Sequence, residues 1–185
     1  MRQRLEANEP KAWQEAVQLL KDRVAGRYLA HAHQLLARPQ SGFAVLAIDC
    51  AVIEALEQFR RGVAKTPRKQ SSAFFEAFLT NTRFKSSFSL KTAKLFYKTI
   101  RCGILHQAEA EATSLVKKKQ AQFVVKLSPA GTGVIINSRR FHEELEAAFN
   151  EYTEALLHGG TDLRGRFITK MHYIARSPQS ETGIV

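Results

Sequence analysis

The stretch SLKTAKLFYKTIRCGILHQ, which runs from Ser89 to Gln107, decides the fold predicted for this chain. Serine is preferred at helix N-termini because its hydroxyl accepts a hydrogen bond from an otherwise unpaired backbone N–H group. We therefore place the N-cap of a central, largely apolar helix at Ser89 and its end near Gln107. This helix carries a permanent positive charge at Arg101 and, five positions later, a titratable imidazole at His106.

Helical patterns flank this stretch on both sides. Apolar residues recur at near-helical spacing from about residue 10 to 37 and again from Phe43 to about Arg61. A short helix is expected from residues 71–72 onward, a longer one from 137–138 onward, and a last short one after Gly159-Gly160. The sequence therefore predicts a mainly α-helical protein.

A small β-hairpin is expected to interrupt the helices at about residues 122–137. Phe123–Leu127 and Val134–Ile136 have strand-like composition, and turn residues lie between them. A lone hairpin is only marginally stable, so this one should pack on the helices or pair with another chain. The length of 185 residues suits a single domain, placed at 1–176, with residues 177–185 as a flexible tail.

The charge of the chain points to a polyanionic partner. The 28 Lys and Arg residues outnumber the 17 Asp and Glu residues, which gives a formal net charge of +11. No acidic residue occurs between Glu76 and Glu109. Aromatic residues are interleaved there, and we assign them to the core rather than to base stacking. A solvated basic face is the alternative. The candidate RNA-binding residues of this interval are Arg83, Lys85, Lys91, Lys94 and Lys98.

Several classes of protein are not expected. The apolar runs are too short for a membrane span, and the charged start does not resemble a secretory leader. The two cysteines fit a reducing cytoplasm and form no zinc motif. Phosphate-binding loops, HExxH motifs and nucleophile elbows are missing, and the histidines are scattered. His31 and His33 lie two apart, so we assign them to the surface or to caps. We expect no metal and no cofactor.

Two carboxylates, Asp49 and Glu54, lie within the apolar pattern of the helix at 43–61. An unpaired buried charge is very costly, so each needs a partner if it is buried. The region around Arg101 is the nearest attractive source of positive charge. Alternatively, both carboxylates face solvent along a narrow polar strip.

Arg101 and His106 together suffice for cleavage of RNA without a metal. The imidazole can act as general base or acid at the 2′-hydroxyl or the leaving oxygen, and the guanidinium can stabilise charge on the phosphate. On an ideal helix, however, the two side chains point roughly 140° apart. Either the helix unwinds near Gly103, or two copies of the chain build the site jointly. In a purely structural alternative, Arg101 pairs with a core carboxylate and His106 caps the helix.

The motif Arg101-Cys102-Gly103-Ile104-Leu105-His106 resembles the Arg-x4–6-His signature of the HEPN superfamily, and the segment 47–59 resembles an early HEPN helix. The resemblance implies an up-and-down helical bundle that dimerises. Cys102 stands where many members carry a polar residue, and Ala108 stands where one toxin subgroup carries tyrosine.

The function implied by this resemblance is metal-independent cleavage of single-stranded RNA in a cleft shared by two subunits. Arg101 and His106 become the catalytic pair, and the supporting residues are expected to be Asp49, Glu54, Cys102 and Gln107. Toxin–antitoxin or antiviral systems are the implied setting, with an antitoxin or effector as a further partner. The alternative is a non-catalytic HEPN-like module that binds RNA, a nucleotide or a protein.

Overall fold

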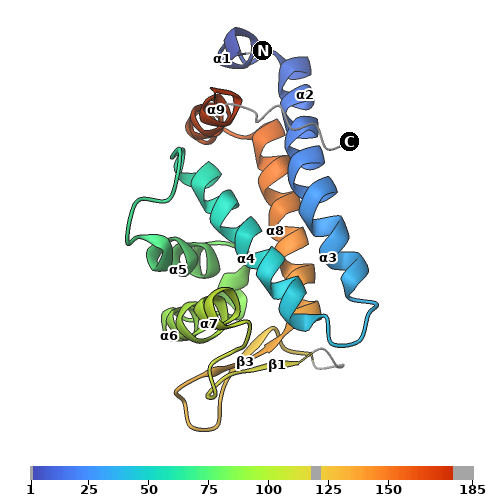
Figure 1. Ribbon diagram of the computed structural model, residues 1–185. Coiled ribbons are helices and arrows are strands. Elements are labelled where there is room, and N and C mark those ends of the chain that lie inside the picture. The colour runs from blue at the N-terminus through green and yellow to red at the C-terminus, as the bar shows by residue number, and fades with distance from the viewer. Residues whose placement is uncertain (1, 118–121, 177–185) are drawn as a thin grey trace.

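A computed structural model describes residues 2–117 and 122–176 of the chain (Figure 1). Most of these residues are helical, and a small three-stranded sheet lies at one end of the molecule. This confirms the prediction of a mainly α fold with a small β insertion. The expected tail, 177–185, falls outside the described residues.

The first part of the chain forms one long helical rod after a short helix, α1 (Arg2–Glu6). Its successive segments are α2 (Pro10–Lys21), η1 (Asp22–Leu29) and α3 (Ala30–Leu35). Backbone angles stay in the right-handed helical region across both junctions. The segment η1 is π-helical, a local widening that often occurs at functional sites. The rod therefore matches the helix expected at 10–37, with a π segment that the pattern did not indicate.

Helix α4 (Gly42–Arg61) lies at the centre of the protein. It packs against α8 (Ser138–His158), α5 (Ser71–Asn81) and α9 (Thr161–Arg176), and it also contacts α3. Figure 1 shows α8 and the α2–α3 rod on one side of α4 and α5, α6 and α7 on the other. Because neighbours surround it, α4 buries residues on most of its circumference.

The central region of the sequence folds as expected around Ser89. A short 3₁₀ helix, η2 (Arg83–Ser86), precedes a continuous helix made of α6 (Leu90–Leu95), η3 (Phe96–Arg101) and α7 (Cys102–Gln107). Ser89 and Thr92 form a reciprocal capping box at its start. The middle segment, η3, is π-helical and ends at Arg101. The helix thus carries a distortion, but it precedes Gly103 rather than coinciding with it.

The aromatic residues of this region form a buried cluster. Phe84, Phe88 and Phe96 are each 4% exposed or less, and all three rings contact the ring of Phe141 in α8. Ring pairs of this kind stabilise a core beyond the area that they bury. Their assignment to the core is confirmed for these three residues, so they are not available to stack on bases.

The sheet contains the expected hairpin and one additional strand. β2 (Val125–Leu127) pairs antiparallel with β3 (Val134–Asn137), and β1 (Leu115–Lys117) pairs parallel with β3, which gives the order β1-β3-β2. Strand β1 was not predicted, because it is only three residues long and two of these three residues are exposed. The sheet contacts α4, α6 and α8, and the helices therefore supply the cover that a hairpin needs.

Helix α9 closes the other end of the bundle, beside α1 (Figure 1). The ring of Phe167 stacks on Phe59 and lies tilted against Trp13, and Lys170 donates hydrogen bonds to the Gln58 side chain and the Ala64 carbonyl. Within residues 2–117 and 122–176, no helix combines the length and the apolar character that crossing a membrane requires.

Gly103 permits a close backbone approach. After α7 the chain folds back, and the Glu111 N–H donates to the Thr99 carbonyl at 2.9 Å. A Cβ atom on Gly103 would lie 2.4 Å from the Glu109 carbonyl oxygen, which is part of this returning segment. The glycine is therefore required by packing against residues 109–111, whereas the helix distortion that the sequence suggested is supplied by η3.

Gly103→Ala is expected to lower the free energy of unfolding by about 1–3 kcal/mol, because the backbone of the returning segment must move. Gly26, in η1, is the matched control, since a Cβ there meets nothing within 4 Å. Gly26→Ala should be neutral or stabilising by up to about 1 kcal/mol. Chemical denaturation of the two variants measures the difference, and equal stabilities would contradict this account of Gly103.

Candidate functional site

Arg101 lies at the junction of η3 and α7, facing α4. Its Nη2 atom donates a hydrogen bond of 3.2 Å to the Glu54 Oε2 atom. The two side chains are only 16% and 24% exposed, so the pair is largely shielded from solvent. The region of Arg101 thus supplies the partner that Glu54 was expected to need.

Aromatic rings also hold the Arg101 guanidinium. Its central carbon lies 5.4 Å from the centre of the Tyr97 ring and 5.7 Å from that of Phe75, which are cation–π distances. Burial works against the charge, but Tyr97 and Glu54 outweigh it, so the pKa of Arg101 is raised and the group stays charged. The Nε atom is buried and has no hydrogen-bond partner among the described residues. Arg101 is therefore fixed in place, and its buried Nε–H group is left without an acceptor among the described residues.

His106 lies in the last turn of α7 and is exposed. In the described part of the chain, no hydrogen bond or ion pair involves it, and none joins it to Arg101. Because α7 is a regular α-helix from Cys102 onward, the spacing of five positions still directs the side chains of Arg101 and His106 roughly 140° apart around the helix axis. One subunit therefore does not bring Arg101 and His106 to a common face.

The other expected supporting residues lie apart from this pair. Cys102 is partly buried with a free thiol, and Gln107 is exposed near the end of α7. The helix ends at Ala108, whose φ of 56° lies in the left-handed region. Asp49 pairs with His142 of α8 rather than with the Arg101 region, which corrects the partner that the sequence suggested.

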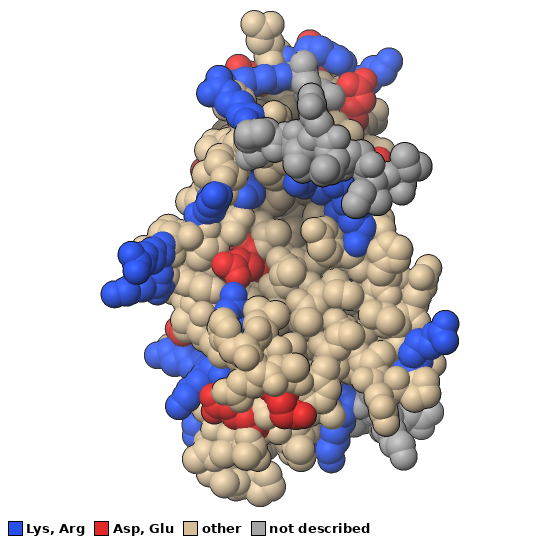
Figure 2. All heavy atoms as spheres, viewed as in Figure 1, with Lys and Arg blue, Asp and Glu red and all other residues tan. Residues whose placement is uncertain are grey.

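Four of the five candidate RNA-binding residues are exposed lysines. Lys91, Lys94 and Lys98 follow one another at helical spacing along α6 and η3, so they form one stripe, and Lys85 lies in η2. None of the four has an ion-pair partner within the described ranges. On the face drawn in Figure 2, basic side chains lie mainly around the margin and the centre is largely uncharged.

Arg83 differs from these lysines, because two carboxylates of α8 occupy its guanidinium. Its Nε atom lies 2.6 Å from Glu144 and its Nη1 atom 2.7 Å from Glu151. The interval from 77 to 108 is free of acidic residues in the sequence, but the fold brings acidic residues to it from elsewhere. Arg83 therefore links η2 to α8 and is not a free cation for RNA.

A second polar cluster, not expected from the sequence, lies between α3, α4 and α8. The His142 side chain and that of Asp49 are both fully buried, and the His142 Nδ1 and Asp49 Oδ1 atoms are 2.8 Å apart. Burial raises the pKa of Asp49 to about 6, although the hydrogen bond to His142 opposes the shift. Burial acts against a charged His142, but the hydrogen bond to Asp49 and the charges of Asp49 and Glu146 together outweigh it, so the pKa of His142 is raised.

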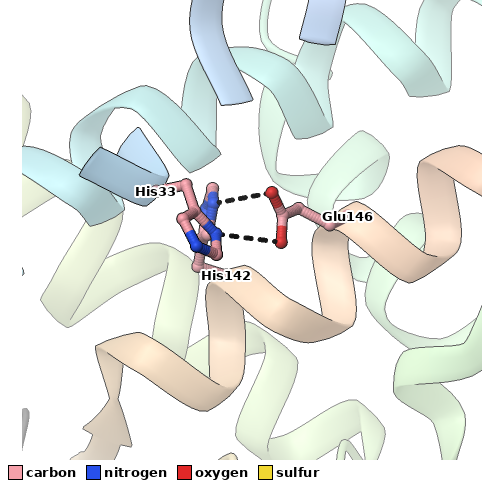
Figure 3. Close-up of side chains that lie close together, drawn as sticks. All are labelled: His33, His142 and Glu146. Carbon is pink, nitrogen blue, oxygen red and sulfur yellow. Dashed lines mark ion pairs between the residues drawn. The ribbon is translucent and has the colours of Figure 1, made fainter. Parts of the chain in front are cut away.

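Figure 3 shows that His33 and Glu146 complete this cluster. The Glu146 carboxylate lies 3.4 Å from the His142 Nε2 atom and 3.4 Å from the His33 Nδ1 atom. The potential ligand atoms of His33, His142 and Glu146 all lie within 4.8 Å of one another. Imidazole nitrogen and carboxylate oxygen are common ligands of transition metals.

The sequence carried only part of the signal for this cluster. His142 and Glu146 are four residues apart in a predicted helix, which places them on one face. His33 lies more than one hundred positions earlier, and nothing in the sequence links it to α8. The assignment of His33 to the surface is correct as to exposure, but the fold brings its Nδ1 atom within 3.4 Å of Glu146, a contact that the pattern did not reveal.

Comparison of the chain with protein-family models, with curated protein sequences and with solved structures found no match.

Proposed function

We propose that this protein is a metal-independent, HEPN-like endoribonuclease that cleaves single-stranded RNA at a site shared by two copies of the chain. The observation that carries the proposal is the setting of Arg101. Glu54, Phe75 and Tyr97 hold its guanidinium in place, one Nε donor remains unused, and an exposed His106 follows in the same helix. Cytoplasmic toxin or antiviral systems, with an antitoxin or effector partner, are part of the same proposal.

The chemistry assigned to the pair follows from the two side chains. An imidazole can act as general base or general acid, so His106 removes the proton from the ribose 2′-hydroxyl or donates one to the leaving 5′-oxygen. The attacking nucleophile belongs to the RNA, and DNA lacks it. Arg101 stabilises the negative charge that builds on the phosphate, and its fixed position lowers the cost of organising the site.

A shared site is the form of the proposal that fits the helix geometry. Within one chain Arg101 faces α4 while His106 faces solvent. A second copy of α7 packed against the first can present its His106 to the opposing Arg101. Leu105, next to His106 and 48% exposed, is an apolar residue that such an interface would bury. The exposed stripe of Lys91, Lys94 and Lys98 would then attract the RNA backbone.

The second candidate is a non-catalytic module, and one observation favours it. The Arg101–Glu54 pair joins two helices and is shielded from solvent, which is what a structural anchor requires. In this case the stripe of Lys91, Lys94 and Lys98 binds RNA, a nucleotide or a protein, and the protein catalyses no reaction. Binding that weakens steeply with salt and forms no product would favour this candidate.

Purified protein is expected to cleave single-stranded RNA in the presence of EDTA, and His106→Ala should lower the rate by about 100-fold or more, because general acid–base catalysis supplies roughly that factor. His158→Ala is the control, since His158 is 81% exposed and lies in another helix. Gel analysis of labelled RNA measures both variants. Equal cleavage by His106→Ala and wild type would remove His106 from the mechanism.

The two-chain site predicts complementation. If each site takes Arg101 from one subunit and His106 from the other, a mixed dimer of Arg101→Ala and His106→Ala subunits contains one intact site. Refolding the two inactive variants together should then restore a measurable fraction of wild-type cleavage. A site contained in one subunit predicts no recovery, so a failure to recover activity in verified mixed dimers argues against the shared site.

The interaction between Arg101 and Glu54 should also contribute measurably to the free energy of unfolding. A double-mutant cycle with Arg101→Ala and Glu54→Gln is expected to give a coupling free energy of about 1–2 kcal/mol, between the values for exposed and buried pairs. The exposed pair Arg140–Glu143 is the control and should couple by less than about 1 kcal/mol. Urea denaturation measures all variants, and no coupling at Arg101 would mean that the pair does not anchor α4.

A further inference from the structure

We infer that His33, His142 and Glu146 form a binding site for a divalent transition metal, with zinc as the best fit, and that Asp49 orients His142 for it. It does not depend on the ribonuclease proposal, because neither Arg101 and His106 nor the residues that hold Arg101 take part in it. The cluster joins three helices. His33 lies on α3, and His142 and Glu146 lie on α8 (Figure 3), while Asp49 lies on α4.

The distances suit an ion between the side chains. Zinc binds imidazole nitrogen and carboxylate oxygen at about 2.0–2.2 Å in tetrahedral geometry, so two ligand atoms on one zinc ion stand roughly 3.3–3.6 Å apart. The His142 Nε2 atom lies 3.4 Å from the Oε1 atom of Glu146, and the His33 Nδ1 atom lies 3.4 Å from its Oε2 atom. All three ligand atoms lie within 4.8 Å of one another, so small rotations of the exposed His33 ring bring them onto one ion.

The hydrogen-bond pattern also leaves a place for a cation beside His142. Asp49 accepts a hydrogen bond from the Nδ1–H group of His142, and in the neutral imidazole this puts the lone pair on Nε2. That Nε2 atom is buried, makes no hydrogen bond, and faces the Glu146 carboxylate at 3.4 Å. A lone pair and a carboxylate repel each other unless a cation lies between them. A proton on Nε2 or a metal ion between the two groups removes this repulsion, and a metal ion binds to both of them.

Asp49 gives His142 the environment of a metal ligand. Metal-bound histidines usually donate their second ring N–H to a carboxylate or carbonyl, which fixes the tautomer and the direction of the ring. The Asp49–His142 contact of 2.8 Å has this arrangement, and both side chains are fully buried. Asp49 is therefore a positioning residue that acts through His142 rather than a ligand.

The ligand set favours zinc over harder ions. Two imidazoles and one carboxylate suit zinc and other late transition metals, whereas magnesium and calcium prefer oxygen ligands throughout. Three protein ligands leave one tetrahedral position for water or a small anion, as in zinc sites that perform chemistry. The site is reached from the side of His33, whose side chain is 61% exposed, and a surface groove of about 490 Å³ begins beside Glu146.

The test is zinc binding by tag-free protein that has been stripped with EDTA and then freed of the chelator. Isothermal titration and elemental analysis should show one zinc ion per chain, and cobalt(II) should give the visible absorption of a tetrahedral site. His33→Ala and Glu146→Gln should each weaken zinc binding at least tenfold. His31→Ala and Glu143→Gln are the matched controls from the same two helices and should bind like wild type.

Asp49→Asn tests the positioning role. It should weaken zinc binding by about 10- to 100-fold, the usual effect of losing a carboxylate behind a metal-bound histidine, and alter the cobalt(II) absorption. A purely structural role for Asp49 would lower the melting temperature without changing the cobalt(II) spectrum. Wild-type protein that binds no zinc, or variants His33→Ala and Glu146→Gln that bind it as wild type does, would overturn the site. RNA cleavage in EDTA is a separate readout and does not decide this result.

Discussion

The burial of α4 is the constraint on which the rest of the structure depends. This helix carries three carboxylates that have little access to solvent, Asp49, Glu54 and Glu57, and a buried charge without a partner would be too costly to keep. Each carboxylate is paired differently. Glu57 is held by Arg60 and Arg61 of its own helix, Glu54 by Arg101, and Asp49 by His142.

These pairs determine how the neighbouring helices lie. Arg101 fixes the junction of η3 and α7 against α4 at Glu54. His142, near the start of α8, fixes that helix against α4 at Asp49. Apolar packing brings the helices together without much directional preference, whereas a hydrogen-bonded ion pair accepts only a narrow range of positions. Both proposals concern residues that these pairs hold in place. A functional group that is also a structural anchor costs little further ordering when it binds a ligand.

Local signals in the sequence predicted much of the fold. The apolar spacing of α4, the N-cap at Ser89 and the turn residues between β2 and β3 all act within a few residues, and the structure contains each of them. The pairing of Glu54 with the Arg101 region could also be anticipated, because a carboxylate in an apolar stripe needs a cation. The π segment η3 could not be anticipated, because it changes the helix over only about one turn. Strand β1 could not be anticipated either, because three residues are too few to show an alternating pattern.

The sequence by itself determined which segments are helical, that the chain is strongly basic, and that Arg101 and His106 share one helix. Only the tertiary structure decided which charges remain free. In the folded chain Arg83 forms ion pairs with Glu144 and Glu151. Asp49 pairs with His142, and His33 lies beside Glu146. The physical reason is that hydrogen-bonding propensity and helical periodicity are properties of neighbouring residues, whereas the partner of a charge depends on which helices pack together. Residues far apart in the chain meet only once the core has formed.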